Sequence, residues 1–154
     1  MTTTNKLTRA EIADSLEAIR AANGGLLRPA DVVDAAADED HPLHDCFTWD
    51  DDAAAHQYRL WQARQMIRVV VTVVSNGGGH TVRAYVSLHD DRGGEEGGYR
   101  AIVDVLSDAE LRQTMLDEAM SELRVFQKKY KALKELVPIF KAIRNVSRRK
   151  GRRG

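Results

Sequence analysis

The last third of the chain constrains the fold most strongly, because residues 107–149 predict one long helix that starts acidic and ends basic. The run Ser107-Asp108-Ala109-Glu110 has the pattern of a capping box, in which the serine hydroxyl and the glutamate carboxylate each accept a backbone amide. Large apolar side chains then recur every three or four residues: Leu116, Met120, Leu123, Phe126, Tyr130, Leu133 and Val137. Such a stripe packs on a partner helix or on the body of the protein.

The spacing of this stripe averages 3.5 residues, which is the coiled-coil value, although Gln127 and Lys134 interrupt strict heptads. We therefore predict that these seven residues form the interface of a homodimer or a higher oligomer. Pro138 is expected to kink or end the helix, with a second short amphipathic piece after it. Residues 147–154 contain no large apolar side chain, and we predict a basic disordered arm there.

The formal net charge is zero, but the charges are strongly segregated. Residues 31–53 contain nine acids and no lysine or arginine, whereas residues 124–154 contain twelve bases and one acid. Basic residues at a helix C-terminus complement the dipole only in the last turn, so that effect does not account for thirty residues of positive charge. Such asymmetry favours a polyanion as partner for the basic end, or attraction between the ends of separate copies.

We predict that the basic end binds nucleic acid through backbone phosphates, which carry no sequence information by themselves. The residues expected to make these contacts are Lys128, Lys129, Lys131, Lys134, Lys141, Arg144, Arg148, Arg149, Lys150, Arg152 and Arg153. A membrane surface is disfavoured, because the basic piece has no tryptophan and little apolar area.

The first sixty-six residues predict three short helices. Thr8 and Glu11 form a second capping box, and Asn23-Gly24-Gly25 ends the helix that it starts. Pro29 suits the first position of the next helix. Its expected buried residues are Val32, Val33 and Ala36. A third helix is predicted from about 50 to 66, capped by the segment 48–51.

The third predicted helix is expected to carry Tyr58 and Trp61 on an aromatic inner face. Three short helices raise the alternative of a DNA-reading helix-turn-helix. The turn region is heavily acidic, and only Arg59 and Arg64 on the third helix have the sign that phosphates require. A plain helical subdomain is therefore favoured.

The middle of the chain predicts a three-stranded antiparallel meander. The strands are expected at 67–74, 81–88 and 99–106, and an Asn-Gly turn joins the first two. In the second strand Val82, Ala84, Val86 and Leu88 alternate with outward Thr81, Arg83, Tyr85 and Ser87. The glycine-rich and acidic segment 89–98 predicts a long solvated loop rather than a phosphate cradle, because it leads into a strand.

The predicted fold class is therefore α+β, with N-terminal short helices, an antiparallel sheet and a long C-terminal helix. Residues 1–106 form the helical segment and the sheet, and residues 107–146 form the helix that packs on the sheet and on a partner copy. Residues 147–154 are the arm. A single cysteine and the absence of a long apolar run indicate a cytoplasmic location.

Part of the N-terminal half resembles a group of small uncharacterised proteins of tailed phages, prophages and bacterial mobile elements. The resemblance covers residues 26–67, about a quarter of the chain, and rests on LRPADVVDAA (27–36), PLHDCFTWDD (42–51) and AAHQYRLWQAR (54–64). It implies a phage-type gene product that acts in the cytoplasm of a bacterial host cell, and it assigns no functional residue.

Candidate chemistry is sparse. His41, His44, Cys46 and His56 are the plausible metal ligands, but they lack the paired spacing of familiar zinc modules. The pairs Asp50 with Asp52 and Asp90 with Asp91 lie in segments expected to be solvated, whereas acid–base catalysis would require at least one carboxylate in a desolvated pocket. We predict no catalytic residue, no bound metal and no cofactor.

Two functions follow as hypotheses. The first is a non-enzymatic, phage-type nucleic-acid-binding protein without implied sequence specificity. The alternative is an oligomeric assembly or adaptor protein whose acidic segment 31–53 docks a basic protein partner.

Overall fold

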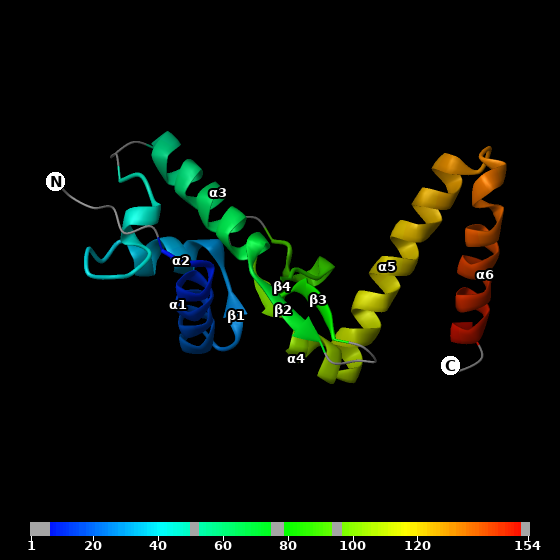
Figure 1. Cartoon of the computed structure of the whole chain (residues 1–154), viewed down its shortest axis with the longest axis horizontal. Coiled ribbons are helices and arrows are strands. Elements are labelled where there is room, and N and C mark those ends of the chain that lie inside the picture. The colour runs from blue at the N-terminus through cyan, green and yellow to red at the C-terminus, as the bar shows by residue number, and fades with distance from the viewer. Residues whose placement is uncertain (1–6, 50–52, 75–78, 94–96, 152–154) are drawn as a thin grey trace. The chain divides into compact units, whose positions relative to one another are not determined.

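The computed structural model describes residues 7–49, 53–74, 79–93 and 97–151, and it divides into two compact units, 1–107 and 108–154 (Figure 1). The architecture is mixed α and β, mostly helical, with two small antiparallel sheets. Within those residues, none of the helices combines the length and the apolar character that crossing a bilayer requires. The α+β class predicted from the sequence is confirmed at this level.

Helix α1 (Arg9–Ala22) begins at the predicted capping box. The Glu11 amide donates to Thr8 Oγ1 at 3.2 Å, and the Thr8 amide donates to Glu11 Oε2 at 2.7 Å. The helix ends at Asn23, and Gly24 and Gly25 follow with φ of 69° and 88°, a region that glycine enters without strain. Both termini were therefore predictable from local chemistry.

Helix α2 (Pro29–Ala36) starts at its proline, and the predicted residues Val32, Val33 and Ala36 are buried. It packs on α3 (Ala53–Val69), and the short 3₁₀ turn η1 (His44–Cys46) lies between the two in sequence. The predicted cap of α3 includes residues 50–52, which lie outside the described residues.

The predicted aromatic inner face of α3 is wrong. The buried face consists of Leu60, Ala63 and Ile67, spaced by three and four residues, while Tyr58 is 49% exposed and Trp61 is 51% exposed. Because successive helical residues turn by about 100°, one face cannot hold both sets. Small Ala63 and branched Leu60 and Ile67 occupy the side that meets α2.

The predicted meander is confirmed in its two antiparallel pairings, of segment 81–88 with 67–74 and with 99–106, but it does not form one three-stranded sheet. Strands β2 (Val71–Val74) and β3 (His80–Arg83) pair only with each other, and the proposed Asn-Gly turn between them lies outside the described residues. A separate sheet has the order β1 (Leu26–Leu27), β5 (Tyr99–Ala101), β4 (Tyr85–Val86). All pairings are antiparallel.

Ala84 connects the two sheets. Its amide donates to the Val70 carbonyl at 2.9 Å, and its carbonyl accepts the Ile102 amide at 2.8 Å. The chain bends here between β3 and β4, so the inward and outward alternation does not continue through it. Tyr85, predicted to face outward, is therefore 5% exposed.

The third predicted strand ends early, because helix α4 (Ile102–Ser107) begins directly after β5. The Ser107 hydroxyl donates to the carbonyls of Val103 and Asp104 in the last turn of α4, so it does not cap the helix that follows. The cap of the next helix, α5 (Ala109–Tyr130), is Asp108, whose carboxylate accepts the amides of Glu110 and Leu111 at 2.9 Å. The Ser107 capping box is a wrong prediction.

The loop after β4 is anchored at both ends. Asp91 is the last residue of the 3₁₀ turn η2 (His89–Asp91). Its side chain is 6% exposed and accepts two hydrogen bonds of 2.7 Å from Arg100. The Gly98 amide donates to the Asp91 carbonyl, and a Cβ on Gly98 would lie 2.6 Å from Leu26 Cγ. A solvated Asp91 was thus a wrong expectation; residues 94–96 lie outside the described residues.

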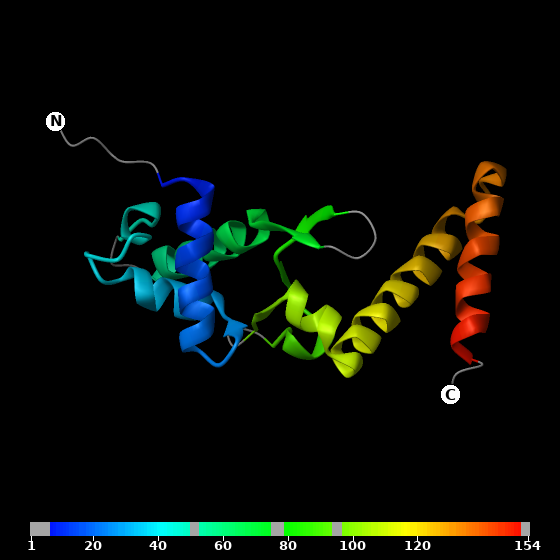
Figure 2. The ribbon, with the colours of Figure 1, turned by 60° about the horizontal axis from the view of Figure 1, so that its bottom comes forward.

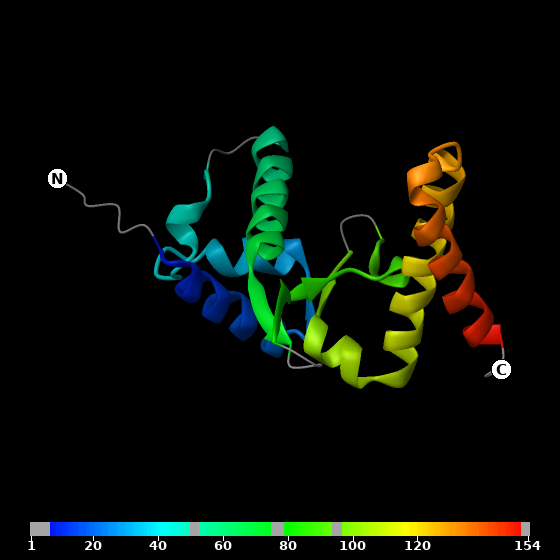
Figure 3. The ribbon, with the colours of Figure 1, turned by 45° about the vertical axis from the view of Figure 1, so that its right-hand side comes forward.

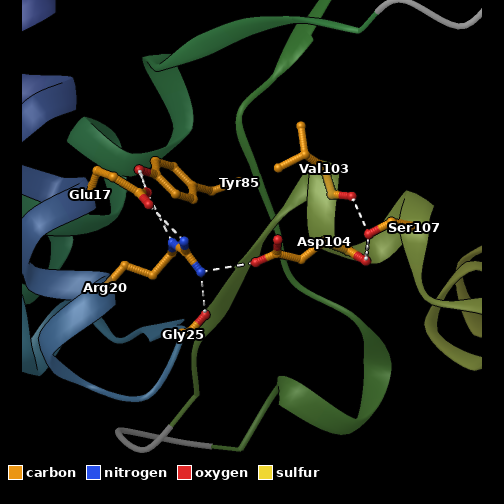
Figure 4. A network of polar contacts seen from close by, with 7 residues as sticks. All are labelled: Glu17, Arg20, Gly25, Tyr85, Val103, Asp104 and Ser107. Atoms are coloured by element: carbon orange, nitrogen blue, oxygen red, sulfur yellow. Dashed lines mark hydrogen bonds and ion pairs between the residues drawn. The ribbon is translucent and has the colours of Figure 1, made fainter.

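Arg20 ties α1 to the sheet and to α4 (Figure 4). Its guanidinium, 15% exposed, contacts Glu17 at 2.6 Å and Asp104 at 3.0 Å, and donates to the Gly25 carbonyl at 3.2 Å. The Tyr85 hydroxyl donates to Glu17 Oε2 at 3.1 Å. The hydrogen bond from Arg20 holds the pKa of Glu17 below its usual value.

Candidate nucleic-acid interface

The predicted long helix is broken, as expected near Pro138, and residues 108–151 form a helical hairpin. Helix α5 ends at Tyr130, the 3₁₀ turn η4 (Lys134–Leu136) follows, and α6 (Val137–Gly151) returns beside α5 (Figures 2 and 3). The reversal precedes Pro138, which sits in the first turn of α6, where a missing amide leaves no helical bond unmade.

The C-terminal arm is also more ordered than predicted. Residues 147–151 continue α6, and the Ser147 hydroxyl donates to the Ile143 carbonyl at 3.1 Å. Residues 152–154 lie outside the described residues. The first basic residues of the predicted arm therefore lie on helix α6.

The hairpin has a thin core of Met120, Phe140 and Ile143, with Tyr130 and Leu136 packed against it. The Phe126 ring lies 4.9 Å from the Tyr130 ring and 6.4 Å from the Phe140 ring, measured between centroids. Part of the predicted apolar stripe therefore packs against α6 of the same chain.

The rest of that stripe stays at the surface of the hairpin. Five of its seven residues are between 37% and 48% exposed: Leu116, Leu123, Phe126, Leu133 and Val137. This apolar row has the composition of an association surface, and its contact with a partner copy or with the sheet stays a prediction.

The formal charge divides at the boundary between the two units. Residues 1–107 contain ten bases and seventeen acids, whereas residues 108–154 contain thirteen bases and six acids. The formal net charge is therefore −7 on the N-terminal unit and +7 on the hairpin. A hairpin with this charge attracts polyanions.

The described basic side chains of the predicted site are all exposed: Lys128, Lys129, Lys131, Lys134, Lys141, Arg144, Arg148 and Arg149. None of the eight forms an ion pair with another residue that the structure describes. Lys150 lies near the end of α6, and Arg152 and Arg153 lie outside the described residues. The Lys129 ammonium lies 5.1 Å from the centre of the Tyr130 ring.

These bases form two groups along the hairpin. Lys128, Lys129, Lys131 and Lys134 surround the reversal between the helices. On α6, Lys141, Arg144 and Arg148 are spaced by three and four residues and share one face, extending over about 10 Å at 1.5 Å per residue. A duplex presents one phosphate charge per roughly 1.7 Å of its axis, so each base can meet a separate phosphate.

The candidate metal ligands are used in local structure. The Leu43 amide donates to His41 Nδ1 at 3.2 Å, and His44 Nδ1 donates to the Ala36 carbonyl at 2.8 Å. Burial raises the pKa of the Cys46 thiol, which disfavours the thiolate that binds metals. Across the described ranges, no three histidine, cysteine, aspartate or glutamate side chains gather to hold an ion.

Sequence reasoning missed the exposed aromatic pair of α3. The available signal was the spacing of Leu60, Ala63 and Ile67, which defines a buried stripe on the other side of the helix.

Searches against protein-family models, curated proteins and solved structures find no match to this chain. The resemblance to phage proteins therefore stays a prediction.

Proposed function

We propose that this chain is a non-enzymatic, phage-type nucleic-acid-binding protein that contacts backbone phosphates through its basic helical hairpin. The contacts come from the end of α5, the reversal and the basic face of α6. Because phosphate contacts do not distinguish bases, the hairpin binds without sequence preference.

The observation that supports this proposal most strongly is the exposure of the hairpin's bases. Eight described lysines and arginines are exposed and form no ion pair with a described acid, on a unit whose formal charge is +7. Exposed basic residues on a unit with this charge produce a positive field at its surface. Binding to phosphates releases counterions and so draws its free energy from this field.

A matched pair of double variants tests the proposal in the full-length protein. Arg144→Gln with Arg148→Gln removes two bases from the α6 face, and Arg9→Gln with Arg112→Gln removes two exposed arginines elsewhere. Binding of a duplex DNA is measured by fluorescence polarisation at low salt. We expect the first variant to weaken binding clearly more than the second. Equal losses in the two variants would show that net charge, and not this face, controls binding.

A second function is favoured by the acidic segment and the apolar row. We infer an alternative role as an oligomeric assembly or adaptor protein, in which the hairpins of two copies associate through Leu123 and Phe126 and segment 31–53 docks a basic partner. Light scattering of the full chain, with and without the Leu123→Gln substitution, tests the association. A constant monomer mass at every protein concentration would reject it.

A further inference from the structure

The exposed side of α3 carries a combination of residues that the basic hairpin does not explain. Tyr58, Trp61, Arg64 and Arg68 are spaced by three, three and four residues, which places them along one side of the helix. The buried residues Leu60, Ala63 and Ile67 lie on another side of the helix, and Arg64, at the border between the two sides, is partly buried. We call these four residues the aromatic–arginine face.

The two rings of this face form a parallel pair at the surface. Their centroids are 5.6 Å apart with an angle of 16° between the planes, and each side chain is about half exposed. Trp49 makes a useful contrast, since its indole donates to the His44 carbonyl, stacks on the His44 ring and lies under the Arg59 guanidinium. Trp49 is thus a packing residue, whereas Trp61 presents its ring to solvent.

The charge of α3 differs from that of its unit. Residues 53–69 include Arg59, Arg64 and Arg68 and no acid. These three arginines make α3 locally basic within a unit whose formal charge is −7.

We propose that the aromatic–arginine face binds single-stranded nucleic acid. Unpaired bases stack on the rings of Tyr58 and Trp61, and the flanking phosphates contact Arg64 and Arg68. A base within a duplex already has both faces stacked, whereas an unpaired base offers a free face to an aromatic side chain. This surface adds base contacts and strand preference, which the phosphate-binding hairpin does not supply.

The test compares two oligonucleotides of fifteen units, one of deoxythymidine and one of abasic deoxyribose, with the full-length protein. Both carry the same phosphates, but only the first has bases to stack. We expect the wild type to bind the thymidine strand about 5-fold or more tightly, which corresponds to the lower end of the range for stacking one base. Trp61→Ala should remove this preference for the thymidine strand, and Trp61→Phe should keep part of the preference.

A matched control and a folding check accompany the measurement. His56→Ala removes an exposed ring from α3 outside this face, and it should leave the ratio unchanged. The thermal unfolding of each variant shows whether α3 stays folded, as expected for side chains that are half exposed. The Arg144→Gln with Arg148→Gln variant should weaken the binding of both oligonucleotides by the same factor. This result would distinguish base stacking on α3 from phosphate binding by the hairpin.

Two results would overturn the inference. If the wild type bound both oligonucleotides equally, the rings would not stack on bases, and the face would fit a protein partner instead. If Trp61→Ala and Trp61→Phe both kept the wild-type ratio, the bases would be contacted elsewhere. Neither result would affect phosphate binding by the hairpin.

Discussion

The two units of this protein place their apolar and charged residues in opposite ways. In the N-terminal unit, thirteen buried hydrophobic residues among those described form one core, and Arg20 is enclosed by Glu17, Asp104 and the Gly25 carbonyl. In the hairpin, the buried core consists of Met120, Phe140 and Ile143 among the residues that the structure describes. The hairpin therefore exposes both its bases and much of its apolar stripe, which suits binding more than stability.

The thin core of the hairpin leads to the largest predicted effect. Phe140→Ala removes the largest of its three buried side chains and should cost about 3–5 kcal/mol, which such a small core cannot compensate. Hydrogen exchange should then show loss of protection across 109–151 while α1 and α2 stay protected. Simultaneous loss of protection in both units would contradict their separation.

The N-terminal core leads to a comparable effect confined to the other unit. Leu60 is 1% exposed on α3, and Leu60→Ala should lower the free energy of unfolding by about 2–5 kcal/mol. The matched substitution Leu116→Ala, at a side chain 37% exposed, should cost much less. Urea unfolding followed by circular dichroism measures both. A similar cost at the two leucines would mean that the row on α5 is buried in an oligomer.

The Arg20 cluster predicts acid sensitivity in the N-terminal unit. Because the hydrogen bond from Arg20 lowers the folded pKa of Glu17, the unfolded chain takes up its proton first as the pH falls. This stability is present above the unfolded value of about 4.3 and is lost as the pH drops through the folded value. The effect should be below about 1 kcal/mol, because Glu17 is half exposed.

The Glu17→Gln variant isolates this contribution. Its unfolding free energy should depend less steeply on pH below about 4.3 than that of the wild type. Urea midpoints measured between acidic and neutral pH give the comparison. Parallel pH profiles for the two proteins would show that Glu17 is not the source of the pH dependence of stability.

Helix capping gives a modest effect in the hairpin. Asp108→Ala should destabilise α5 by about 0.5–2 kcal/mol, because the amides of Glu110 and Leu111 lose their acceptor. Ser107→Ala is the control, since its hydroxyl bonds only to carbonyls of α4. Thermal unfolding of both variants measures the difference. A larger loss at Ser107 would restore the capping box that the sequence suggested.

Local features of the fold were predictable from the sequence, and nonlocal ones were not. The Thr8 cap, the glycine end of α1 and the buried valines of α2 follow from interactions within a few residues. The pairing of β1 with β5 joins residues more than seventy positions apart, and no local pattern specifies it. Ile102 and Val105 favour a strand by propensity, yet the packed structure places them in α4.

The candidate site shows the same division. Composition was enough to locate the basic end, but not the reversal that turns one predicted helix into α5 and α6. An apolar stripe has the same spacing whether its partner helix belongs to the same chain or to another copy. The exposed Trp61 was missed for a related reason, because a large aromatic residue is usually assumed to be buried.

The salt dependence of duplex binding tests the central claim most directly. A duplex offers phosphates but no free base faces, so it isolates the hairpin from the aromatic–arginine face. If about six lysines and arginines contact phosphates, a plot of the logarithm of the affinity against the logarithm of the salt concentration should have a slope of roughly −5 for the wild type. The slope should be shallower by about 2 in Arg144→Gln with Arg148→Gln. A slope near zero, or an identical slope in that variant, would contradict phosphate binding by the hairpin.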